Sequence, residues 1–267
     1  MRVLILGCGP AGLMAAHAAA MGNHDVVIVS RARKSFMKGA QYLHKPIPMA
    51  TRSPGFTVTY ELRGTPDSYR EKVYGPGYRG TVSPEELSDT HTAYDIREAY
   101  DWLWNIYGGY VINDDFDAQK AYKIEKLIEW AKADTVISTV PAPILCKNPD
   151  HSFTAEYIWA IGEEHAEDYA IGMNHVICNG EDYPAWYRIA NIHGHKSVEW
   201  PQFRKPPIPN VFNVTKPVKT TCTCFPDVVR MGRYGKWEKG VLSHTAFYET
   251  AALLSQPEQL RLDIRNG

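Results

Sequence analysis

The chain opens with a short apolar run that leads directly into a cluster of glycines. Residues 3–6 are all apolar, which is typical of a strand buried on both faces of a parallel sheet. Three glycines in G-x-G-x-x-G spacing then open an alanine-rich stretch, which predicts a helix over residues 11–21. A second apolar strand follows at residues 26–29. This order predicts a Rossmann-like unit with a dinucleotide site at its first turn.

Each position of this turn has a physical role in such a site. Gly7 permits the tight bend, Gly9 lets the backbone approach a pyrophosphate, and Gly12 lets the helix pack closely on the strand. Pro10 and Ala11 begin the helix, whose first N–H groups would point at the phosphates. A Rossmann-like unit that has lost its ligand is the alternative interpretation.

The middle of the chain leaves this simple pattern. Residues 35–90 are rich in Gly and Pro, which indicates irregular chain with short elements. Alternation, N-cap signals and helical spacing then predict further elements. They are a strand at 56–62, a helix starting at Ser83, helices at 95–107 and 118–133, and a β-branched strand at 134–140 that Pro141 closes.

Residues 151–215 read mostly as short strands and turns. The predicted strands are 169–173, 175–178, 186–193 and 196–200. Together they indicate an antiparallel sheet inserted into the dinucleotide fold. Such a sheet typically covers a cofactor and carries substrate contacts, and a packing layer without chemistry is the alternative.

The C-terminal part contains a second strand, glycine turn and helix. A strand ends in the turn Gly232-Arg-Tyr-Gly235, and a helix is expected over residues 244–254. This helix would aim its N-terminus at the same cofactor from the other side. Arg233 suits a pyrophosphate or a flavin carbonyl, whereas a surface arginine in a glycine-rich turn is the simpler interpretation.

Composition limits the classes of function. The chain has 267 residues, 44% hydrophobic and 22% charged, with a net charge of −1, so it can bury a real core and shows no overall signal for nucleic-acid binding. No apolar run reaches membrane-spanning length, and the immediate first strand leaves no room for a signal peptide. Five cysteines are an odd, sparse set that favours a reducing cytoplasm.

The residues after the second strand bear on which dinucleotide is bound. An acid that would hold a ribose is replaced by Ser30, and Arg31, Arg33 and Lys34 follow. Ser30 could make a weaker ribose contact in an FAD site, or Arg31 and its neighbours could bind the 2′-phosphate of NADP. A solvated basic loop is the third interpretation. Taken alone, this position favours NADP.

The whole layout resembles FAD-binding proteins of the glutathione-reductase type, in particular UDP-galactopyranose mutase and the flavin amine oxidases. Segments at both ends and in the middle carry the resemblance. They are the turn at residues 7–12, Gly39-Ala-Gln-Tyr42 beside the flavin, the strand ending at Pro141, Pro184-Ala-Trp-Tyr-Arg-Ile189 followed by Glu199, and Gly232-Arg-Tyr-Gly-Lys-Trp237.

This resemblance implies bound FAD, with Gly39, Ala40, Gln41 and Tyr42 near the flavin. It also implies that Gly232, Arg233, Tyr234, Gly235 and Trp237 approach the flavin from the other end of the chain. The chain is much shorter than a mutase, so the sugar substrate does not carry over. A compact flavoprotein would suit a small genome such as that of a phage, where flavin enzymes serve nucleotide or DNA modification.

Four side chains are candidates for catalysis. His44 and Lys45 follow the expected flavin loop, where a cation would stabilise a reduced, anionic ring or hold an acidic substrate. Arg188 and Tyr187 alternate along a strand, so only one faces a site, and Arg188 is the candidate for substrate contact. His244 starts the last helix as a cap, a flavin contact or an acid/base.

The cysteines give no compact metal motif. Cys222-Thr-Cys224 has C-x-C spacing and is joined by no second pair and no nearby H-x-x-x-H, so alternating cysteines on a strand are expected and no metal ligand is assigned. A redox pair is a further alternative.

The sequence therefore predicts an α/β flavoprotein with a Rossmann-like FAD-binding core and an inserted antiparallel and helical cap. Residues 1–50, 108–150 and 210–267 are assigned to the core, and 51–107 and 151–209 to the cap. The expected activity is hydride transfer to FAD or flavin-assisted bond cleavage on a small polar substrate or a modified nucleotide or nucleobase. The alternatives are an NADP-dependent reductase using Arg31 and Arg33, and a non-catalytic binding protein. DNA modification is a sub-case that would need a basic, aromatic groove.

Overall fold

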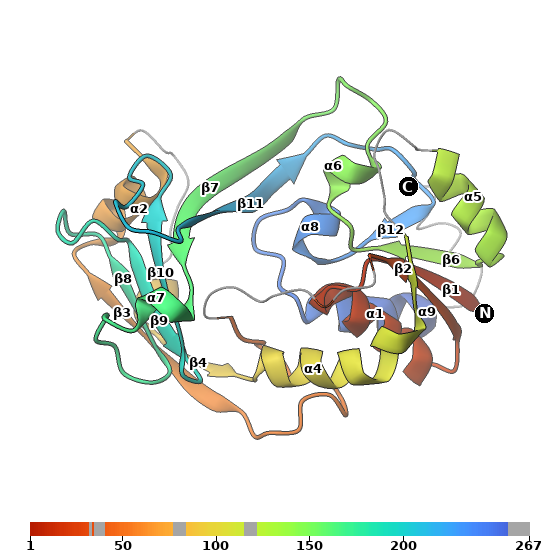
Figure 1. The fold of residues 1–267 in the computed structure, drawn as a ribbon, viewed down its shortest axis with the longest axis horizontal. Helices are drawn as coiled ribbons and strands as arrows, with labels where there is room; N and C mark the ends of the chain where they lie inside the picture. Colours follow the sequence, from red (N-terminus) through yellow and green to blue (C-terminus); the bar gives the residue numbers. More distant parts are fainter. Residues whose placement is uncertain (32–33, 35–40, 77–83, 115–121, 256–267) are drawn as a thin grey trace.

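The protein is built around two sheets at opposite ends, joined by two long strands (Figure 1). The computed structural model describes residues 1–31, 34, 41–76, 84–114 and 122–255. The strand order is β12-β6-β1-β2-β5 in one sheet and β11-β7-β10-β9-β8-β3-β4 in the other. This arrangement confirms the predicted fold class, a Rossmann-like parallel sheet flanked by helices with a second sheet inserted.

All neighbouring strands of the five-stranded sheet are parallel. They are β1 (Arg2–Leu6), β2 (Asp25–Ser30), β5 (Val111–Asn113), β6 (Thr135–Ser138) and β12 (Val228–Arg230). In β1, Val3 and Ile5 join the hydrophobic cluster on one face, and the intervening Leu4 joins the cluster on the other face. Because both faces are covered, the strand is continuously apolar and does not alternate with polar residues.

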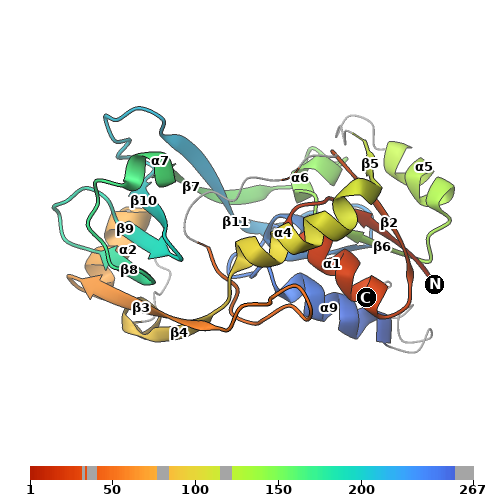
Figure 2. The same cartoon turned by 60° about the horizontal axis from the view of Figure 1, so that its bottom comes forward.

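Helices cover both faces of this sheet. The helices α1 (Pro10–Met21), α4 (Ile96–Tyr107) and α9 (Thr245–Ser255) lie together on one face (Figure 2). On the other face lie α5 (Tyr122–Ala131) and the short α6 (Ala142–Leu145). The alanines of α1 allow its two neighbours to approach closely. Within the described part of the chain, no helix combines the length and apolarity needed to cross a bilayer.

The seven-stranded sheet is mixed, which corrects the predicted antiparallel sheet. Its strands are β3 (Phe56–Arg63), β4 (Thr90–Ala93), β7 (Phe153–Ile161), β8 (His175–Asn179), β9 (Arg188–Ile192), β10 (His195–Pro201) and β11 (Phe212–Thr220). Strands β3 and β8 pair in parallel, because the chain passes through the five-stranded sheet between them. The remaining short helices are α2 (Pro66–Tyr74), α3 (Pro84–Ser88), η1 (Gly108–Tyr110), α7 (Glu163–Ala166) and α8 (Gly232–Lys236).

The structure differs from several predictions about which elements form and which part of the fold they join. No strand forms over residues 169–173, where a turn follows α7 and Tyr169 packs edge-on against Trp200. The segment at 210–220, assigned above to the core, forms β11 and pairs with β7 in the second sheet. Helix α4, assigned to the cap, packs on α1, and its Tyr100 hydroxyl donates to the Cys8 carbonyl at 3.0 Å. Ser83 lies outside the described residues.

Strands β7 and β11 are antiparallel neighbours that span the distance between the two sheets. Strand β7 runs toward the second sheet, and β11 runs back toward the first. The two sheets are therefore connected by paired strands that leave the core after β6 and return to it before β12. This pairing places the carboxyl ends of β1, β6 and β12 beside the start of the second sheet, where a ligand of a parallel sheet is expected.

Candidate functional site

The turn between β1 and α1 is tightly packed and depends on its glycines. Gly7 has φ of 104°, and a Cβ at Gly12 would stand 2.0 Å from the Gly7 carbonyl oxygen. The N-cap residue Gly9 gives α1 no side-chain hydrogen bond, and the first turn of the helix has no acidic residue. Among the residues that the structure describes, the first N–H groups of this twelve-residue helix thus receive no side-chain acceptor from the N-cap, as a phosphate site requires.

A second glycine turn meets the first. Gly232, between β12 and α8, has φ of 68°, and a Cβ there would lie 2.8 Å from the side chain of Ala11. Gly235 lies so close to the β6 end that its Cβ would be 2.6 Å from the Ser138 carbonyl oxygen. The structure therefore brings together the two turns that the sequence placed around one cofactor, at the carboxyl edge of adjacent strands β1, β6 and β12.

Arg233 supplies an unpaired donor next to these turns. Its Nε is buried and has no hydrogen-bond partner among the described residues, while its Nη2 lies 3.5 Å from the Pro217 carbonyl oxygen. Burial lowers the pKa of this guanidinium below its ordinary value. A buried N–H without an acceptor is costly, so its position fits a ligand with an acceptor oxygen or nitrogen.

Other residues predicted at this turn have structural partners. The Tyr234 hydroxyl donates to the Thr215 carbonyl at 2.9 Å, and the Trp237 indole N–H donates to the Thr154 carbonyl at 3.0 Å. Both bonds fasten α8 to the paired strands β7 and β11. Pro141 stands at the N-cap of α6, just beyond the carboxyl end of β6. These residues position the turn. Arg233 differs from them, because its Nε–H has no hydrogen-bond acceptor among the described residues.

The segment expected beside the flavin is described in part. Gly39 and Ala40, like Arg33, lie outside the described residues. The Tyr42 hydroxyl lies 3.1 Å from the Tyr60 hydroxyl, and burial raises the pKa of Tyr42 far above its usual range. Tyr42 thus ties the end of this segment to β3 of the second sheet.

His44 and His244 come together beside Tyr42. The His44 ring centroid lies 4.7 Å from that of Tyr42 and 6.0 Å from that of His244. Burial, followed by the nearby His91, lowers the pKa of His44. Burial, with His44 and Lys45 nearby, lowers the pKa of His244 to about 4. Both rings are therefore neutral near pH 7, and Lys45 is the cation here.

The buried His244 predicts an acid-sensitive fold. Because its pKa falls from 6.5 to about 4 on folding, only the unfolded chain takes up a proton between these values. The free energy of unfolding should therefore fall by about 3 kcal/mol as the pH drops from 6.5 to 4. Replacing His244 with Gln should remove most of that slope in urea titrations. His195→Gln, at a hairpin turn, is the control and should keep the slope; an unchanged slope in His244→Gln would refute this account.

Arg188 lies in a compact ionic cluster within the second sheet. Arg188 Nη2 donates to Glu199 Oε1 at 2.5 Å, and Lys216 Nζ lies 3.1 Å from Glu199 Oε2 and 3.0 Å from the Tyr187 hydroxyl. The Tyr187 hydroxyl also donates to Glu199. Two cations therefore share one carboxylate and leave one net positive charge.

Burial and neighbouring charge act against each other in this cluster. Burial alone would raise the pKa of Glu199, but Arg188 and Lys216 hold it well below its usual range. Burial lowers the pKa of Lys216 to about 8, although Glu199 opposes the shift. Both groups are mostly charged at neutral pH, with side chains 12% and 19% exposed.

A cleft of about 220 Å³ opens beside this cluster. Tyr69, Tyr74, Phe203 and Tyr187 supply aromatic walls, and Arg188 and Lys216 supply the charge. Sequence reasoning missed Lys216 and expected only one of Tyr187 and Arg188 to face a site. Tyr187 precedes β9, outside its regular alternation, so both side chains reach Glu199. The alternation of side chains in the segment around Lys216 was the sequence signal that could have placed this residue on a strand.

An acidic residue, Asp114, lies beside Ser30 at the end of β2. The backbone N–H of Asp114, just after β5, donates to the Ser30 carbonyl at 2.8 Å. Strand β5 pairs with β2, so Asp114 sits at the same carboxyl edge as Ser30. The Arg31 carbonyl accepts from the Cys8 thiol, and Lys34 pairs with Asp101 of α4. The basic run is thus in part engaged within the protein.

The fold and its paired turns define a Rossmann-like α/β protein with a second, mixed sheet. No family model and no curated protein matches the chain in sequence. Solved structures do match it: reduced UDP-galactopyranose mutase has 11% identity and a TM-score of 0.54, covering 99% of this chain and 98% of that one.

The 2,6-dihydroxypyridine-3-hydroxylase of Arthrobacter nicotinovorans has 9% identity and a TM-score of 0.56, covering 99% of this chain and 86% of that one. The structure of CtdE in complex with FAD and a substrate has 12% identity and a TM-score of 0.50, with coverage of 99% and 84%. These likenesses show a fold shared by different flavoproteins and do not single out the glutathione-reductase type.

Proposed function

We propose that this protein is an FAD-dependent enzyme that acts on a small anionic substrate. The observation that carries the proposal is the meeting of the Gly7–Gly12 and Gly232–Gly235 turns, with the unpaired Arg233 Nε beside them. The CtdE structure, which has a similar fold, is described with FAD. A dinucleotide with its pyrophosphate at the first turn would bring the flavin toward the second turn and the cleft.

The residues of the chain divide into two groups under this proposal. The N–H groups at the start of α1 bind the pyrophosphate, Ser30 and Asp114 stand at the ribose, and Arg233 donates to the flavin or the pyrophosphate. Bound FAD supplies a hydride acceptor for a C–N or C–O bond, or assists bond cleavage without net oxidation. The neutral His44 and His244 are suited to accept a proton near the flavin.

The proposed class of substrate is inferred from the positive charge of the cleft. Arg188 and Lys216 together exceed the charge of Glu199, so an anionic group gains charge-assisted hydrogen bonds there. The aromatic walls suit a planar or apolar portion of the same molecule. A carboxylate or a nucleotide phosphate has this chemistry, and a modified nucleotide is the narrower case. DNA modification remains a sub-case of the same proposal.

The first experiment is the visible spectrum of the freshly purified protein, with the cofactor released by denaturation and identified by mass. We expect flavin bands and one FAD per chain. Replacing Arg233 with Ala should raise the Kd for FAD about 10- to 100-fold, because a charged hydrogen bond is lost. Arg233→Lys should be intermediate, and Arg63→Ala, on the exposed end of β3, should leave the Kd unchanged.

Other outcomes separate the alternatives. A colourless protein that takes up no FAD but binds NADP, with binding abolished by Arg31→Ala, would replace this proposal with an NADP-dependent reductase. A bound flavin that no reductant or candidate acid turns over would indicate a binding protein. If Arg233→Ala left FAD affinity unchanged, the second half of the site would be assigned wrongly.

A further inference from the structure

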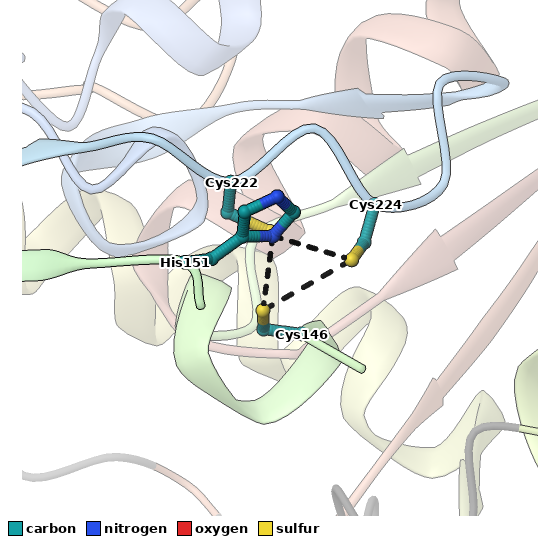
Figure 3. Close-up of side chains that lie close together, drawn as sticks. All are labelled: Cys146, His151, Cys222 and Cys224. Atoms are coloured by element: carbon teal, nitrogen blue, oxygen red, sulfur yellow. Dashed lines mark hydrogen bonds between the residues drawn. The ribbon is translucent and has the colours of Figure 1, made fainter. Parts of the chain in front are cut away.

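A group of three cysteines and one histidine lies where the chain crosses between the two sheets (Figure 3). Cys146 ends α6 and His151 precedes β7, on the way out of the core. Cys222 and Cys224 lie between β11 and β12, on the way back. The two crossings are thus brought side by side by these four residues, which lie in loops rather than on a strand.

The distances between the side chains match those of a tetrahedral metal site. Cys146 Sγ lies 4.0 Å from Cys224 Sγ, and His151 Nδ1 lies 3.5 Å from Cys146 Sγ and 3.6 Å from Cys224 Sγ. All four ligand atoms lie within 4.8 Å of one another. With Zn–S of about 2.3 Å and Zn–N of about 2.0 Å, a tetrahedron requires S···S of about 3.8 Å and S···N of about 3.5 Å.

Hydrogen-bond donors surround Cys222 and Cys224. Arg230 Nη2 lies 3.2 Å from Cys222 Sγ, and the same guanidinium donates to the carbonyls of Cys222 and Cys224. Backbone N–H groups of Lys147 and Asn148 donate to the Cys224 sulfur. The Arg230 charge would balance the single negative charge of Zn²⁺ with three thiolates.

We propose that Cys146, His151, Cys222 and Cys224 bind one Zn²⁺ ion in a closed structural site that clamps the two crossings between the sheets. Thiolate and imidazole ligands in a tetrahedral arrangement select zinc, and four protein ligands leave no position for substrate. Binding replaces the remaining thiol protons with the metal, so protons are released and no electron is transferred. The inference does not depend on FAD.

The position of the site gives it a mechanical role. Residues 146 and 224 are 78 positions apart, and the whole second sheet apart from β3 and β4 lies between them. Closing this long loop in the folded state adds metal-binding free energy to folding, because the unfolded chain has no preformed site. The metal would also hold β7 and β11, and with them the cleft, against the α8 turn.

Metal content is the direct test. The protein is expressed with added zinc and purified under reducing conditions without chelator. Elemental mass spectrometry should then find about one zinc ion per chain. Cys224→Ser and His151→Ala should lose it, and Cys178→Ala, a buried cysteine in β8, should keep it. Removing the metal from the wild type should lower its Tm, and adding zinc back should restore it.

Cobalt gives a readout that does not require a folded variant. Reduced, metal-free wild-type protein titrated with Co²⁺ should develop thiolate–cobalt charge-transfer bands and intense visible bands typical of a tetrahedral site, saturating at one equivalent. Absence of zinc together with no Co²⁺ uptake would overturn the proposal. So would a Cys146–Cys224 disulfide in protein freshly purified under reducing conditions without chelator, iron as the bound metal, or zinc retained by both ligand variants.

Discussion

Replacing Gly12 with Ala is expected to abolish dinucleotide binding and to destabilise the fold severely. The new Cβ would stand 2.0 Å from the Gly7 carbonyl oxygen and 2.9 Å from Thr139 Oγ1. The nearest obstacle is backbone that already holds Gly7 at positive φ, so it cannot rotate aside as a side chain would. We expect a loss of about 3–5 kcal/mol in unfolding free energy and a Tm about 10 °C lower.

The matched control is Gly162→Ala, because nothing lies within 4 Å of a Cβ built at that glycine. It should change Tm by a degree or two and leave cofactor binding intact. Thermal melts and FAD titration of both variants separate the two effects. A Gly12→Ala protein that melts like the control and binds cofactor normally would show that the turn does not require close packing of helix on strand.

The first β-α-β unit could be predicted because its constraints are local. A strand buried on both faces must be continuously apolar, and the turn at Gly7 and Gly12 admits only glycine. The second turn, at Gly232, could be recognised for the same reason. That Gly232 lies against Ala11 follows from β12 and β1 flanking β6, a strand order that the sequence did not predict.

The pairing in the second sheet could not be predicted from local patterns. An alternating strand signals that one face is buried, but it carries no information about which strand lies beside it or in which direction. Strand β3 is joined by a parallel β8 more than a hundred residues later, and β11 pairs with β7 across a register shift. Residues 210–220, part of the range 210–267 assigned to the core, form β11 of this sheet.

Clusters made by distant residues were also out of reach. Lys216 meets Glu199 and Tyr187 only because β11, β7, β10 and β9 are neighbours in one sheet. Cys222 and Cys224 lack a compact second pair in the sequence, and their partners Cys146 and His151 lie more than 70 residues upstream. Composition shows how many such residues exist, and only the strand order shows which ones meet.

Replacing Glu199 with Gln is expected to be the most destabilising change in the second sheet. The amide keeps the shape of the side chain but removes the charge that Arg188 and Lys216 share. Breaking a largely buried ion pair from one side typically costs about 3–5 kcal/mol, because the remaining charges are left uncompensated. Urea denaturation should show this loss, and the pKa of Lys216, already lowered to about 8, should fall further.

Glu61→Gln is the matched control, because its pair with Arg63 is exposed, with side chains 46% and 41% accessible, and should contribute less than about 1 kcal/mol. Adding Lys216→Met to Glu199→Gln should recover part of the lost unfolding free energy. The second substitution removes one of the two cations that Glu199→Gln leaves without a counter-charge. If Glu199→Gln cost no more than Glu61→Gln, the cluster would be solvated well enough to need no counter-charge. An anionic substrate would then gain little from Arg188 and Lys216, and the cleft would be the wrong place to look for it.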